Sequence, residues 1–122
     1  MQNTATKYSA AISALLAALT DLQARKPDEH VQLACTNTMQ ALQKAQQHVL
    51  KDDACVGDAL SSAKEAMEGG TPDYEWTECF DEALGTLTMA ANEQIGPEAT
   101  AAYTALLKAE EAFAALLDAI EG

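Results

Sequence analysis

The fold of this chain is decided by the stretch from Pro97 to Glu121, which reads PEATAAYTALLKAEEAFAALLDAIE. At the 3.6-residue period of an α-helix its apolar side chains form one stripe, made of Ala102, Leu106, Ala109, Phe113, Leu116 and Ile120. The opposite side carries Thr104, Lys108, Glu111 and Asp118. Such a helix is stabilised mainly by packing its apolar stripe, because propensity alone leaves it marginal in water. We therefore expect the rest of the chain to supply helices that cover this stripe.

Proline, glycine and capping residues divide the rest of the chain into four further helices. We predict helices over about residues 4–25, 27–51, 53–69 and 71–96, before the last one at 97–121. The boundary signals are Thr4, Pro27, Asp52 or Asp53, Gly69-Gly70, Thr71-Pro72-Asp73 and Gly96. Each connection is short, so successive helices should be antiparallel neighbours. The prediction is an all-α fold, an up-and-down antiparallel helical bundle of four to five helices, with residues 1–122 forming a single domain.

Each predicted helix carries an apolar stripe at the same period. Val49 closes the expected stripe of the second helix, Met67 that of the third and Ile95 that of the fourth. The side chains expected to meet in one core include Leu19, Leu84, Leu87 and Phe113. The side of the first helix opposite its stripe carries Ala10, Ala14 and Ala17. These alanines fit either plain helix propensity or a close-packing surface for another helix or a second copy.

The composition indicates a folded protein with one hydrophobic core. Hydrophobic residues make up 48% of the 122 residues, which excludes a disordered chain. No apolar run approaches the ~20 residues that a membrane span needs. The first residues lack a basic segment followed by an apolar one, so we expect no secretory signal and a cytoplasmic protein. An odd number of widely spaced cysteines, Cys35, Cys55 and Cys79, argues against a disulfide framework.

No pattern of residues predicts catalysis, a cofactor or a metal site. His30 and His48 lie on one predicted helix, but a rise of ~1.5 Å per residue places them roughly 27 Å apart. The Glu-x-x-His pairs of di-iron bundles, Cys-x-x-Cys pairs and glycine-rich phosphate loops are all missing from the sequence. Cys55 lies near the start of a predicted helix, where the helix dipole could lower the pKa of its thiol and make it reactive. We expect no enzyme activity, no cofactor and no metal.

Charge is distributed unequally along the chain. Through residue 64 six acidic side chains are matched by six basic ones, whereas from Glu65 onward thirteen acids accompany one base, Lys108. The formal charge of −12 therefore belongs entirely to the second half. Salt adaptation would acidify the whole surface, so the pattern fits either a solvated face or a face that meets something basic. Direct binding to nucleic acid is disfavoured, because phosphate recognition needs basic clusters.

Two classes of function remain open after these observations. The first is a non-enzymatic interaction protein, an acidic inhibitor or adaptor that occupies a basic surface of a partner, as anti-defence or immunity proteins do; a surface that normally holds nucleic acid would be such a target. The expected partner is a protein with a Lys/Arg-rich surface, without direct nucleic acid or membrane binding, and a homo-oligomer is compatible with the sequence. The predicted partner-binding residues are Glu75, Glu78, Asp81, Glu82, Met89 and Glu93. The second class is a small helical enzyme or a metal or ligand carrier with its site inside the bundle.

Overall fold

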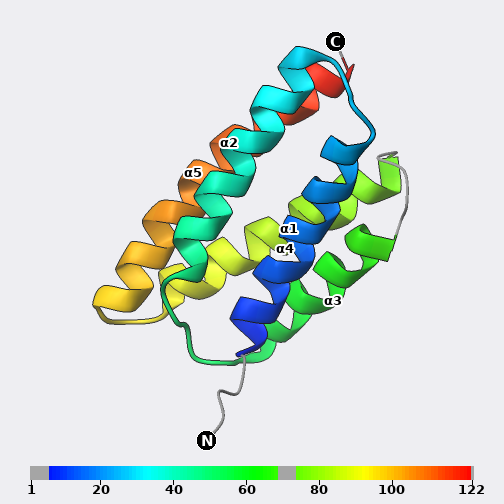
Figure 1. The fold of residues 1–122 in the computed structure, drawn as a ribbon. Helices are drawn as coiled ribbons and strands as arrows, with labels where there is room; N and C mark the ends of the chain where they lie inside the picture. The colour runs from blue at the N-terminus through cyan, green and yellow to red at the C-terminus, as the bar shows by residue number, and fades with distance from the viewer. Residues whose placement is uncertain (1–5, 69–73, 122) are drawn as a thin grey trace, which may run out of the picture.

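The computed structural model describes residues 6–68 and 74–121, with the side chains of Tyr74 and Glu75 outside the description. These residues form five α-helices and no strand: α1 Lys7–Ala24, α2 Glu29–Gln46, α3 Ala54–Glu68, α4 Tyr74–Glu93 and α5 Pro97–Glu121. Successive helices run in alternating directions along the molecule (Figure 1). The predicted all-α helical bundle is confirmed.

The five helices are neighbours in an order that differs from their order in the sequence. α5 packs against α2 and α4, α4 packs against α3, and α1 lies between α3 and α2, which closes a ring. Within the described residues α2 and α3 make no contact, although they are consecutive. The expectation that every successive pair would be neighbours therefore fails at this one connection, because α1 lies between the two helices.

The connection from α2 to α3 passes the beginning of α1, and an aspartate explains how it is held there. The backbone amide of Lys7, in the first turn of α1, donates a 2.8 Å hydrogen bond to the Asp52 carboxylate. The next residue, Asp53, accepts a 2.9 Å hydrogen bond from the amide of Val56 and so caps α3. The sequence offered Asp52 or Asp53 as the cap of a single helix. In the structure Asp52 accepts a hydrogen bond from the first turn of α1, and Asp53 accepts one from the first turn of α3.

Several predicted helix ends differ from the observed ones, including the end of α4, which stops at Glu93 before the predicted Gly96. α1 is capped by Thr6, whose hydroxyl accepts a 3.0 Å hydrogen bond from the amide of Ser9; Thr4 lies outside the described residues. α2 begins at Glu29, two residues after Pro27, and ends at Gln46, well before Lys51. The predicted start signal of the fourth helix, Thr71-Pro72-Asp73, also lies outside the described residues. The bounds of α5 agree with the prediction.

The buried apolar side chains form one continuous core, and the four side chains predicted to share it do so: Leu19, Leu84, Leu87 and Phe113. Three residues predicted to extend the stripes lie outside the core, since Val49 is 59% exposed, Met67 43% and Ile95 98%. Val49 and Ile95 follow the ends of α2 and α4, where the helical period no longer applies. Leu50 is buried in the place expected for Val49. No helix in the described part of the chain is both long and apolar enough to cross a bilayer.

Candidate functional site

The orientation of α4 is fixed by an aromatic cluster on its buried side. The rings of Trp76 and Phe80 stack at a centroid distance of 5.3 Å, and the ring of Phe80 stacks on Phe113 of α5 at 4.4 Å. Stacked aromatic side chains combine a large buried area with a preferred geometry. The side of α4 opposite to this cluster is consequently turned toward solvent.

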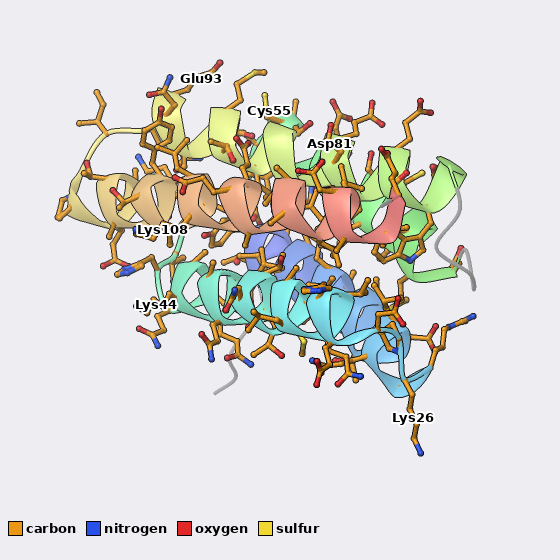
Figure 2. The ribbon with its side chains drawn as sticks, turned by 90° about the horizontal axis from the view of Figure 1, so that it is seen from above. Lys26, Lys44, Cys55, Asp81, Glu93 and Lys108 are labelled. Carbon is orange, nitrogen blue, oxygen red and sulfur yellow. The ribbon has the colours of Figure 1, made fainter. Side chains whose placement is uncertain are left out.

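The predicted partner-binding residues lie on that solvent side of α4. Glu78, Asp81, Glu82 and Glu93 are exposed, and Met89 is 53% exposed among them. Figure 2 shows Asp81 and Glu93 along the same edge of the molecule. Glu75 belongs to the first turn of α4, but its side chain lies outside the description. The five described residues are thus available together on one surface.

Helix α3 adds carboxylates to this surface that are not among the predicted partner-binding residues. The hydroxyl of Ser62 donates a 3.2 Å hydrogen bond to Oε1 of Glu82, which ties one carboxylate of α4 to α3. Asp58 and Glu65 lie four residues before and three residues after Ser62, so all three share one side of α3. The spacing of Asp58, Ser62 and Glu65 at one helical turn is the sequence pattern that would have identified these two carboxylates. We use the name acidic face for Asp58, Glu65, Glu78, Asp81, Glu82, Met89 and Glu93.

Two cysteines lie within the acidic face, and partial burial together with nearby carboxylates raises the pKa of both. Partial burial and the nearby carboxylates of Glu93, Asp53 and Asp58 raise the pKa of the Cys55 thiol. Partial burial, a hydrogen bond to Glu65 and the charges around it do the same for the Cys79 thiol. The expectation that the helix dipole could lower the pKa of Cys55 is therefore wrong, because partial burial and the surrounding carboxylates both oppose the thiolate. All three cysteines are free thiols.

The histidines and carboxylates of the described residues do not converge on a metal site. Among the described residues, no group of three or more His, Cys, Asp or Glu side chains could hold a metal ion. His48 approaches a carboxylate of α5 instead, with 3.6 Å between its Nδ1 and Oε1 of Glu98. His30 is exposed on the first turn of α2.

The interior of the bundle holds few polar side chains, and their hydrogen bonds are made within the protein. The hydroxyl of Tyr8 donates a 2.8 Å bond to the carbonyl of Ala45, and Cys35 donates a 3.2 Å bond to the carbonyl of Leu19. The buried Thr38 and Thr88 each donate to the carbonyl four residues earlier. Among the described residues no buried side-chain nitrogen or oxygen lacks a partner. Each of these four side chains thus donates its hydrogen to a backbone carbonyl of the bundle.

Comparison with known proteins gives no match: no family model, no curated protein and no solved structure matches this chain. The most uneven property of the protein's surface is its charge, because the acidic face concentrates carboxylates on α3 and α4.

Proposed function

We propose that this protein is a non-enzymatic interaction protein, an inhibitor or adaptor whose acidic face occupies a Lys/Arg-rich surface of a partner protein. The observation that carries this proposal is the exposure of six carboxylates on one surface of α3 and α4. Within the described part of the chain none of them forms an ion pair with a basic side chain. A basic partner would supply the missing counter-charges.

The free protein keeps this face at an energetic cost. Glu78 and Glu82 are one helical turn apart, and like charges at that spacing are destabilising by ~0.2 to 0.5 kcal/mol. A partner rich in lysine and arginine would replace this repulsion by attraction and would also accelerate association by electrostatic steering. Such recognition weakens as salt shortens the screening length.

Met89 gives the acidic face an apolar contact among its charges. It is exposed on α4 between Glu82 and Glu93 along the helix. Methionine adapts its shape to irregular surfaces, so it suits a contact that must fit between lysine and arginine stems. Where the partner normally holds nucleic acid, the row of carboxylates would take the place of phosphates and the two ligands would compete.

Charge reversal on the acidic face tests this proposal. The full chain is immobilised and exposed to lysate over a salt titration, beside a variant with Glu78→Lys and Glu82→Lys. A matched control carries Asp118→Lys and Glu121→Lys, which makes the same change of charge on the exposed last turn of α5. We expect the wild type and the control to retain a basic protein at low salt, and the reversed variant to lose it.

The circular dichroism spectrum and melting temperature of each variant show whether the fold is retained. The two new lysines repel each other as the two glutamates did, but each lies among the remaining carboxylates of the acidic face and is attracted to them. The variant at Glu78 and Glu82 should therefore melt at the same or a slightly higher temperature. Adding an oligonucleotide to the captured complex then shows whether nucleic acid competes for the partner. Equal capture by the reversed and wild-type proteins would mean that the acidic face is only a solvated surface.

A further inference from the structure

A groove between α2 and α5 has the opposite charge to the acidic face. Lys44 of α2 and Lys108 of α5 line two adjoining hollows, and Figure 2 shows both lysines on neighbouring helices, away from Asp81 and Glu93. The larger hollow, with a volume of about 450 Å³, is also lined by Gln47, His48, Ala101, Thr104 and Ala105. We call this hollow the Lys44–Lys108 groove. No carboxylate lines this groove, but Glu98 lies 3.6 Å from the lining residue His48 and Glu111 borders the adjoining hollow.

Short side chains on α5 create the space between the lysines. Ala101 and Ala105 are half-buried at positions four residues apart, so they lie one above the other on the same side of the helix. Each of these side chains is a single methyl group, so α5 fills little of the space that the longer side chains of Lys44 and Lys108 border. The groove therefore combines apolar methyl groups with positive charge.

The charges of the groove are not explained by contacts within the described residues. Lys108 is the single base among thirteen acids after residue 64, yet neither Lys108 nor Lys44 forms an ion pair in the described part of the chain. Lys44 lies in the last turn of α2, where the helix dipole favours a cation. Lys108 lies in the middle of α5, where the helix dipole gives no such preference for a cation. Two ammonium groups bordering one hollow repel each other, and a bound anion would offset this repulsion by its attraction to both.

We propose that the Lys44–Lys108 groove binds a small organic anion, one with a carboxylate or phosphate group attached to an apolar body. The two ammonium groups hold the charged end, and the side-chain amide of Gln47 supplies a further hydrogen bond. The methyl groups of Ala101 and Ala105 cover the apolar end. This site lies on α2 and α5, so it is independent of the function proposed for the acidic face.

An NMR titration of the full chain at low ionic strength tests the site with three probes: inorganic phosphate, phenyl phosphate and benzoate. Amide signals of residues 44–48 and 101–108 should move, and phenyl phosphate should bind more tightly than inorganic phosphate because the alanines contact its ring. The stronger of phenyl phosphate and benzoate identifies the preferred anionic group. Replacing both lysines, Lys44→Gln with Lys108→Gln, should weaken binding by at least about tenfold.

The control removes the same amount of charge elsewhere. Lys26 lies at the far end of the molecule in Figure 2 and Lys64 is exposed on α3, so Lys26→Gln with Lys64→Gln should leave the affinity within about twofold of wild type. Melting temperatures of both double variants verify that the fold is retained. The proposal is overturned if the probes move no localised set of signals, or if the two double variants lose affinity equally.

Discussion

The thiol of Cys79 on α4 donates a hydrogen bond to Oε1 of Glu65 on α3, with 3.6 Å between sulfur and oxygen. This contact and the bond from Ser62 to Glu82 cross the same junction between the two helices. The carboxylates of α3 and α4 therefore belong to one surface whose charge also acts on the thiols within it.

Removing one of these carboxylates should make a thiol more reactive. We expect Glu65→Gln to lower the pKa of Cys79, because the substitution removes a negative charge that opposes the thiolate. Only the thiolate reacts with iodoacetamide, so the pH profile of Cys79 alkylation should move to lower pH. Mass spectrometry of the digested protein follows each cysteine separately. Cys55 serves as the internal control, since its pKa is raised by other carboxylates; an unchanged Cys79 profile would contradict the assignment.

Truncating a side chain in the centre of the core should cost much of the stability. Leu87 is fully buried, and replacing it by alanine removes packed atoms and leaves a cavity. We expect Leu87→Ala to lower the free energy of unfolding by about 2 to 5 kcal/mol, measured by urea denaturation. Leu33 is 62% exposed on α2, so Leu33→Ala should change it by less than about 0.5 kcal/mol. Equal effects of the two substitutions would show that the buried stripe of α4 is misassigned.

Replacing a glycine inside a helix by alanine should stabilise the protein. Gly57 in α3 and Gly85 in α4 have open space where a Cβ atom would lie. Alanine at either position should raise the free energy of unfolding by about 0.4 to 1 kcal/mol, because the unfolded chain loses conformational freedom. Gly96 also has open space, but its φ of +126° disfavours a side chain, so Gly96→Ala should be destabilising. Urea denaturation of the three variants checks the order; a stabilising Gly96→Ala would contradict it.

Stability should fall in alkaline solution because two buried groups resist ionisation. Burial raises the pKa of Cys35 from 9.0 to about 11, and it also raises the pKa of Tyr8. The unfolded chain releases these protons at a lower pH than the folded protein does. Their contribution to stability is thus complete below the unfolded pKa values and is lost as the pH rises through the folded ones.

The measurement is the urea midpoint as a function of pH in the wild type and in a variant with Cys35→Ala and Tyr8→Phe. We expect the midpoint of the wild type to decrease above pH 9, toward and beyond about pH 11. The double variant should start from a lower stability, because it loses packing and a buried hydrogen bond. Its decrease over the same pH range should be shallower. Parallel curves would show that these two groups do not titrate differently in the folded and unfolded states.

The parts of this structure that depend on neighbouring residues in the sequence were predictable. The bounds of α5 follow from Pro97 and a regular apolar period, and the exposed side of α4 follows from the same period. The arrangement of α2 next to α5 was not predictable, because an apolar stripe does not specify which other stripe covers it. For the same reason the sequence did not reveal that Glu65 approaches Cys79, or that Lys44 and Lys108 border one groove.

The position of α5 in the ring has a consequence for the protein during its synthesis. α5 is the last helix in the sequence, yet α2 and α4 both bury side chains against it. While residues 97–121 remain inside the ribosome, α2 and α4 expose the apolar side chains that α5 covers in the folded protein. Such transiently exposed surface favours aggregation and chaperone binding. We therefore expect the nascent chain to become resistant to protease only after α5 has emerged from the ribosome and packed against α2 and α4.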